Sequence, residues 1–218
     1  MAGAAAAMEQ LFSIYWYPIY AAIRRKRGLS HHDAEDMTQG FFAHLLEYDT
    51  LTRATQEDKR FRNYLLAVLD KFMANKHAAA NALKRGGGQT TFSLDAALAN
   101  ELYACEPAVP PVDDKVYDRE WAKALVRQVL ARLKNEYEQE GDGRIFSQLG
   151  LHLTDPVAAV PYARCAADLG MQEGAVRVAM HRLRRRFGEL LRGEIAQTVS
   201  DKDDIDDELR HLIAALMS

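Results

Sequence analysis

Residues 162–191 read YARCAADLGMQEGAVRVAMHRLRRRFGELL and hold the most informative pattern of this chain. Its first part predicts a short helix with Tyr162, Ala166 and Leu169 facing inward, ended by Gly170. Its second part predicts a longer helix, because apolar residues recur every three or four positions: Val176, Met180, Leu183, Phe187 and Leu190 or Leu191. A short helix, a glycine turn and a longer basic helix form the pattern of a helix-turn-helix motif.

Polar side chains project from the other face of the longer helix. The DNA major groove, about 12 Å wide, accepts one α-helix, whose early residues reach base edges while later arginines neutralise phosphates. The residues placed for base contacts are Gln172, Glu173, Arg177 and His181, and those placed for phosphate contacts are Arg184, Arg185 and Arg186. A basic helix by itself is often only a solvated surface, and it is the preceding helix and turn that favour DNA binding.

Working outward, helical periodicity dominates the rest of the chain and predicts an all-α protein. The first expected helix ends at Gly28 and has an apolar stripe of Leu11, Ile14, Tyr15, Ile19 and Ile23. A second, capped by Ser30 or Asp33, has the stripe Ala34, Met37, Phe41 and Leu45, widened by Phe42 and Leu46. A third runs from Phe61 to about Lys84, and a fourth from about Asp118 to Tyr137. A short helix around Ile145 to Leu151 is expected before the quoted stretch.

Breaks in this periodicity divide the chain into four ranges. Two small helical domains are expected at residues 1–85 and 118–197, joined by a flexible linker at 86–117 that begins with three glycines. Residues 198–218 form an acidic helical extension with 6 acidic and 2 basic residues. Both domains are mildly basic, with 12 basic against 9 acidic residues in 1–85 and 13 against 10 in 119–197. The basic blocks could each meet a polyanion, and the acidic segments could mask them.

Composition excludes several classes of protein. The chain has 218 residues, 48% of them hydrophobic and 27% charged, which is enough to bury a core. Cys105 and Cys165 lie in no ligand or disulfide pattern, so no metal site is expected. No apolar run approaches the roughly 20 residues of a membrane span, and no signal peptide is apparent, so a cytoplasmic protein is expected. No nucleophile motif or phosphate loop is present, so neither enzymatic activity nor a cofactor is predicted.

Residues 33–39, Asp-Ala-Glu-Asp-Met-Thr-Gln, gather acidic groups in the first turns of the second helix. The simplest interpretation is helix capping, since the helix dipole favours acids there. Asp36 and Gln39 remain as polar groups on one helix edge, suited to contact a basic or polar partner helix, with Asp33 and Glu35 in support. Adjacent His31 and His32 point to different sides and do not suggest a metal pair.

The third helix mixes aromatic and basic residues, a combination that can stack unpaired bases and follow a phosphate backbone. The candidates are Arg60, Arg62, Tyr64, Lys71, Asn75 and Lys76. Periodicity assigns Phe61 and Phe72 to the core instead, and leaves Tyr64 undecided.

Together these motifs resemble an extracytoplasmic-function (ECF) sigma factor of bacterial RNA polymerase. Residues 11–85 resemble region 2 and residues 121–196 region 4 of that family. The heptad is similar to its DAED-x-x-Q motif, which implies that Asp33, Glu35, Asp36 and Gln39 bind the β′ clamp helices of core polymerase. The resemblance further implies that the third helix reads the -10 promoter element, that the helix-turn-helix reads the -35 element, and that the β flap is a second contact.

Three features depart from the family pattern. Lys71 and Asn75 occupy positions where the family usually has Asn and Asp, so the promoter sequence does not follow from the resemblance. Residues 137–160 are longer than the usual connection, and the acidic extension lies beyond the minimal family pattern. Together with the linker glycines, these two features resemble sigma factors associated with Ser/Thr kinases, so an anti-sigma factor or such a kinase is the regulator to be considered. Phosphorylation would fall on Thr50, Thr52 or Thr55, although ordinary loop threonines are the simpler interpretation.

Two other hypotheses remain open. The chain could be a stand-alone helix-turn-helix regulator that binds operator DNA as a dimer, with its amino-terminal helices as a dimerisation unit. The heptad and the aromatic-basic helix argue against it, because such a regulator needs neither. An α-helical enzyme has no supporting motif, since Gly86 to Gly88 follow a helix and lack the Lys-Ser/Thr of a phosphate loop.

Overall fold

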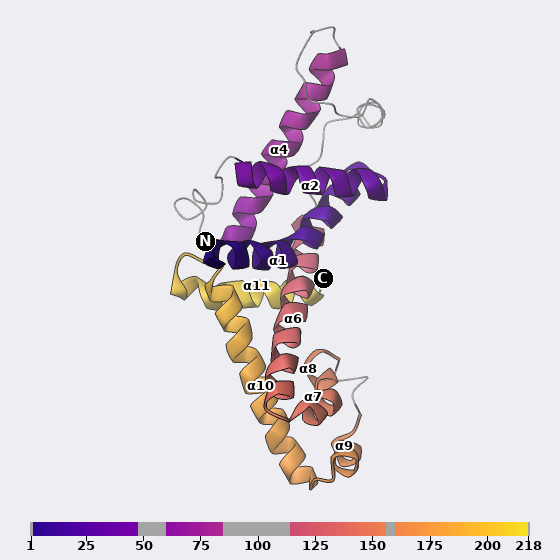
Figure 1. Cartoon of the computed structure of the whole chain (residues 1–218), viewed down its shortest axis with the longest axis vertical. Coiled ribbons are helices and arrows are strands. Elements are labelled where there is room, and N and C mark those ends of the chain that lie inside the picture. The colour runs from indigo at the N-terminus through magenta and orange to yellow at the C-terminus, as the bar shows by residue number, and fades with distance from the viewer. Residues whose placement is uncertain (1, 48–59, 85–113, 156–159, 218) are drawn as a thin grey trace. The chain divides into compact units, whose positions relative to one another are not determined.

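The computed structural model describes residues 2–47, 60–84, 114–155 and 160–217, and all the named secondary-structure elements in these ranges are helices (Figure 1). The predicted all-α class is therefore confirmed for this part of the chain. The elements are α1 (Ala2–Arg27), α2 (His31–Glu47), α4 (Phe61–Lys84), α6 (Asp114–Gln139), α7 (Gly143–Leu149), α8 (Leu151–Thr154), α9 (Tyr162–Leu169), α10 (Glu173–Ala196), the 3-10 turn η1 (Lys202–Asp204) and α11 (Ile205–Met217).

The described residues form two compact units. The first unit holds Met1–Ala124 together with Thr198–Ser218, and the second holds Leu125–Gln197. This division differs from the predicted ranges at two places: the beginning of α6 and the whole acidic extension lie in the first unit. The predicted linker falls mostly on residues 85–113, which lie outside the described residues, as do Thr50, Thr52 and Thr55.

A glycine turn joins α1 to α2 in the first unit. Gly28 has a φ of 59°, a left-handed conformation that glycine adopts without steric strain, and it ends α1 where the sequence predicts. Of the two predicted caps of α2, the structure uses Ser30, whose Oγ accepts a hydrogen bond of 3.2 Å from the Asp33 amide. The same hydroxyl donates to the Asp33 carboxylate at 2.5 Å, so Asp33 supports the cap.

Aromatic pairs hold α1, α2 and α4 together. The rings of Tyr15 and Phe61 meet edge to face at 5.4 Å, and those of Phe41 and Phe72 do so at 5.6 Å. Such pairs contribute about 0.5–1.5 kcal/mol each beyond the area they bury. The predicted stripe of α2 is buried, but Leu46 is 49% exposed and does not widen it. The helix periodicity places Leu46 at the edge of the stripe, where it stays half-exposed.

The first unit also buries one face of α6 and one face of α11. Tyr117 and Trp121 on α6 are fully buried, and Leu212 on α11 is 1% exposed. The segment before α11 is tied to the start of α4, because the Thr198 carbonyl accepts a hydrogen bond of 2.9 Å from the Phe61 amide. The acidic extension is therefore a folded part of the first unit.

The second unit is a bundle formed by the rest of α6 with α7, α8, α9 and α10. Its core contains the fully buried side chains of Leu125, Val129, Leu133, Leu149, Cys165, Val176 and Leu183. Two predictions here need correction. The expected helix from Ile145 to Leu151 is two elements, α7 and α8, that meet at Gly150. Phe187 is only half-buried, so the stripe of α10 continues through Leu190 and Leu191.

Candidate nucleic-acid interface

A glycine turn joins α9 to α10, at the position that the sequence predicts. Gly170 is left-handed, with φ 67° and ψ 30°. Its amide donates to the Ala167 carbonyl at 3.3 Å, and the Met171 amide donates to the Ala166 carbonyl at 2.9 Å. This pair of bonds is the Schellman motif, which ends a helix and redirects the chain. Gln172 follows in an extended conformation, and its carbonyl accepts the first bonds of α10.

The exposed face of α10 carries most of the residues that the sequence assigns to DNA. Gln172, Glu173, Arg177, His181, Arg184 and Arg185 are all exposed. Glu173 and Arg177 form an ion pair of 2.6 Å across one turn, and the pKa of Arg177 is raised by that hydrogen bond. Both side chains are largely solvent-exposed, so the ion pair contributes little to stability, and the guanidinium is able to exchange Glu173 for another partner.

Arg186 is an exception among the predicted phosphate contacts. Its guanidinium binds the Glu136 carboxylate on α6 with two hydrogen bonds, of 2.8 and 3.0 Å, and Glu189 with a third of 3.2 Å. The hydrogen bonds from Arg186 lower the pKa of Glu136 and raise that of Arg186 itself. Arg186 therefore connects two helices of the second unit and does not belong to the open basic face.

Sequence reasoning missed one residue of this face. Val178 is 53% exposed although it is a branched aliphatic residue in the middle of a polar surface. It lies three positions before His181 and one after Arg177, on the side of α10 away from the buried stripe. The signal was available, since Val178 falls outside the predicted stripe, but periodicity alone gives no role to a single apolar residue there.

In the first unit, the predicted -10 residues divide between two sides of α4. With 3.6 residues per turn, Tyr64, Lys71 and Asn75 share one face, on which Lys71 and Asn75 are exposed and Tyr64 is half-buried. The Tyr64 ring lies 6.3 Å from that of Phe61 in a stacked arrangement, so the undecided tyrosine is part core and part surface. Lys76 is half-buried, with its ammonium 5.5 Å from the centre of the Phe72 ring.

Arg62 lies on the other side of α4 and is only 5% exposed. Its guanidinium donates to the Glu208 carboxylate of α11 at 2.6 Å and to the Asp118 carboxylate of α6 at 2.8 Å. It also lies over the Trp121 ring, at 5.4 Å from the ring centre. In this conformation Arg62 cannot contact DNA, contrary to its predicted place on the surface.

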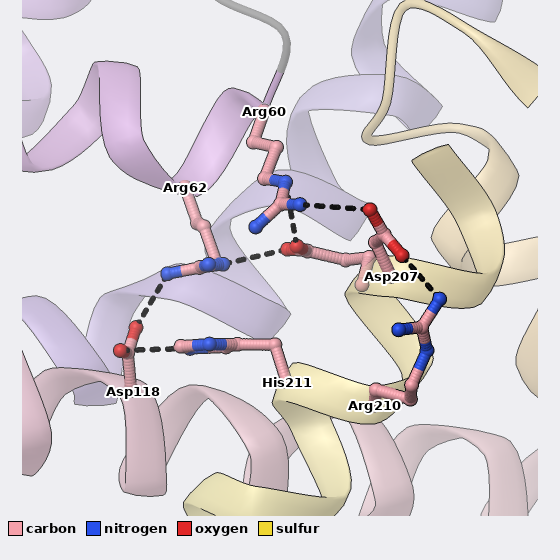
Figure 2. A network of polar contacts seen from close by, with 7 residues as sticks. Arg60, Arg62, Asp118, Asp207, Arg210 and His211 are labelled. Carbon is pink, nitrogen blue, oxygen red and sulfur yellow. Dashed lines mark hydrogen bonds and ion pairs between the residues drawn. The ribbon is translucent and has the colours of Figure 1, made fainter. Parts of the chain in front are cut away.

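Other charged groups join Arg62 in what we call the arginine network (Figure 2). Arg60 is 3.3 Å from the second oxygen of Glu208 and 4.0 Å from Asp207. His211 contacts Asp118 at 2.8 Å through Nε2. Glu208 is 1% exposed and Asp118 13%, so three helices bring together charges that are mostly removed from water. Sequence reasoning missed Asp118, Glu208 and His211, because nothing local marks residues that meet across such separations.

Two tyrosines line the buried side of the network. Tyr117 donates a hydrogen bond of 3.3 Å to the carbonyl of Arg62, and Tyr15 packs nearby on α1. Burial raises the pKa of both hydroxyls well above the ordinary value, so they stay neutral. Uncharged groups therefore line the buried side of the network, and its positive and negative charges balance one another.

The acidic heptad lies at the start of α2. Asp36 and Gln39 are exposed there, while Glu35 is half-buried and Asp33 is engaged in the cap. His32 lies 3.8 Å from Asp36, a weak contact between exposed groups. The structure therefore leaves Asp36 and Gln39 on the surface, as the sequence predicts, and gives Asp33 a local structural contact.

Comparison with protein-family models, with curated proteins and with solved structures finds no match to this chain. Within the described ranges, no three His, Cys, Asp or Glu side chains gather in a way that could hold a metal ion. None of the described helices is long and apolar enough to cross a membrane.

Proposed function

We propose that this chain is an RNA polymerase sigma factor of the extracytoplasmic-function type, which directs core polymerase to promoters. The observation that carries the proposal is the helix-turn-helix geometry at Gly170, followed by a helix whose exposed face carries Arg177, His181 and Arg185. A helix presented in this way fits the major groove, and its arginines suit guanine edges and phosphates. The chain would have no chemistry of its own.

The first unit supports the same function through two surfaces. Asp36 and Gln39 are exposed on α2 and would bind the clamp helices of the polymerase β′ subunit. Tyr64, Lys71 and Asn75 share a face of α4 and would meet the -10 strand, by stacking and by contact with phosphates. The division into two compact units agrees with the separate reading of two promoter elements.

In vitro transcription with purified core polymerase on genomic fragments tests the proposal. Substituting Asp36→Lys should abolish promoter-directed transcription and association with core polymerase, because it reverses a charge on the proposed clamp contact. The matched control is Glu47→Lys, the same change at an exposed position at the other end of α2, which should leave both intact. The Asp36 variant should retain the melting temperature of the native chain, since Asp36 is 57% exposed.

Full transcription by the Asp36→Lys variant would remove the polymerase assignment. Specific duplex binding without any association with polymerase would favour the stand-alone regulator instead. A second readout concerns the helix-turn-helix: because Arg177 is assigned to a base edge, Arg177→Ala should weaken duplex binding by about fivefold or more and relax its sequence preference.

A further inference from the structure

The acidic α11 contacts two of the arginines that the sequence assigns to the -10 strand. It packs through Leu212 and Ala215, which are 1% and 7% exposed, and it inserts Glu208 beside Arg60 and Arg62. Both arginines belong to the predicted -10 set, and Figure 2 shows them turned toward α11 and α6. An element of the chain itself therefore holds two of the cations assigned to the promoter strand.

We propose that α11 competes with nucleic-acid phosphates for Arg60 and Arg62, so that the free chain withholds these side chains from single-stranded DNA. The inference rests on the proposed function and names the regulation of the same site. Displacement of α11 frees Arg60 from Glu208 and removes one of the two carboxylates from Arg62, and docking of α11 restores both contacts.

The chemistry of the two occupants is alike. A guanidinium binds carboxylates and phosphates through the same planar fork of donors. One carboxylate oxygen of Glu208 accepts a hydrogen bond of 2.6 Å from Nε of Arg62, and the other oxygen lies 3.3 Å from Nε of Arg60. A phosphodiester offers two anionic oxygens of similar spacing, and it can replace the carboxylate without leaving either cation unpaired. Asp207, 4.0 Å from Arg60, adds a second competing charge.

The contact has the properties of a reversible one. A buried ion pair adds little net stability, because desolvation of both ions offsets their attraction. When α11 leaves, Glu208 regains water while the arginines gain phosphate, so no buried charge is stranded. The apolar contact of α11 is limited: Leu212 and Ala215 are buried and Ile205 and Leu209 half-buried, while the other large apolar side chains, Ile213, Leu216 and Met217, are exposed. Arg62 keeps Asp118 and Trp121 on α6, so Arg60 is the side chain that α11 releases most completely.

The test uses the full chain and a fluorescein-labelled single strand of mixed sequence, about 20 nucleotides long, which exceeds the usual footprint of a single-strand-binding domain. The Glu208→Gln variant should bind this strand about fivefold more tightly than the native chain, the gain expected for one released phosphate-contacting cation. The matched control is Asp203→Asn, which removes one charge from the exposed turn before α11 and should bind no more than twofold more tightly. Combining Arg60→Ala with Glu208→Gln should remove the gain.

A measurement on the native chain keeps the inference testable if the Glu208 variant folds poorly. Saturating amounts of the same strand should speed hydrogen exchange of the α11 amides (Ile205–Met217), because bound DNA displaces the helix. Unchanged or slower exchange in α11 overturns the inference, as does a gain in Glu208→Gln that equals the control or survives Arg60→Ala.

The proposed function is judged separately, by duplex binding and by association with core polymerase. If both persist while Glu208→Gln gains nothing, the competition fails and the sigma-factor proposal stands. If no variant binds single strand, duplex or polymerase, both fail together.

Discussion

Replacing Arg62 by Met is expected to destabilise the first unit by about 3 kcal/mol or more. Breaking a buried ion pair by removing one partner costs about 3–5 kcal/mol, because the remaining charge is left uncompensated away from water. Glu208 at 1% exposure is such a charge. Two contacts moderate the loss: Arg60 lies 3.3 Å from Glu208, and His211 lies 2.8 Å from Asp118. The expected value is therefore at the lower end of the range.

Methionine is the appropriate replacement because it keeps the length and apolar stem of the side chain. The cation–π contact with Trp121 is lost as well, a contribution of about 0.5–2 kcal/mol that overlaps with the ion-pair effect. In a chain of this size each kcal/mol lowers the melting temperature by about 2–4 °C.

Urea unfolding followed by tryptophan fluorescence measures this effect in the first unit specifically. The chain has two tryptophans, Trp16 and Trp121, and both lie in that unit. A double-mutant cycle with Glu208→Gln isolates the pair, and the double variant should be more stable than the sum of the single losses predicts, by about 1–3 kcal/mol. A loss below about 1 kcal/mol for Arg62→Met, or no coupling with Glu208, would show that Arg62 is solvated and that the arginine network does not form in solution.

Three further predictions concern the second unit. Gly170→Ala should destabilise the second unit by about 1–2 kcal/mol in thermal denaturation, because at a left-handed φ of 67° a Cβ lies too close to the following carbonyl oxygen. The control is Gly174→Ala inside α10, which has open space for a Cβ and should be neutral or stabilising. Arg186 lowers the folded-state pKa of Glu136, so the pair adds stability above the unfolded pKa of the carboxyl group, and this stability is lost as pH falls through the folded-state pKa. In urea unfolding, the stability difference between the native chain and Arg186→Met should therefore shrink as the solution is acidified below that unfolded pKa, and a difference constant with pH would contradict the pairing. Val178→Ser should leave the melting temperature unchanged, because the side chain is 53% exposed. It should alter the sequence preference of duplex binding, because an exposed valine on this face is suited to contact a thymine methyl group, and an unchanged preference in selection from a random duplex pool would contradict this role.

Local signals in the sequence predict the elements correctly where one stretch of chain suffices to determine them. The C-terminal ends of α1, α4 and α9 and the start of α10 follow from glycine punctuation and apolar periodicity, because both act over a few residues. The exposed positions of Asp36 and of Arg177 follow in the same way, from their place opposite a buried stripe. The division of residues 143–154 into α7 and α8 does not follow, because the apolar periodicity of so short a stretch does not show where one helix ends and the next begins.

Local patterns in the chain are therefore sufficient for the all-helical class of the described ranges, the helix–glycine–helix pattern at Gly170 and the basic exposed face of α10. Three features depend on packing between helices: Arg62 lies in a buried network, Arg186 binds Glu136, and α11 belongs to the first unit. The physical reason is that periodicity gives the direction of a side chain relative to its own helix but not the charge on the helix that faces it. Arg62 and Glu208 are far apart along the chain, and packing of α11 is what makes them partners.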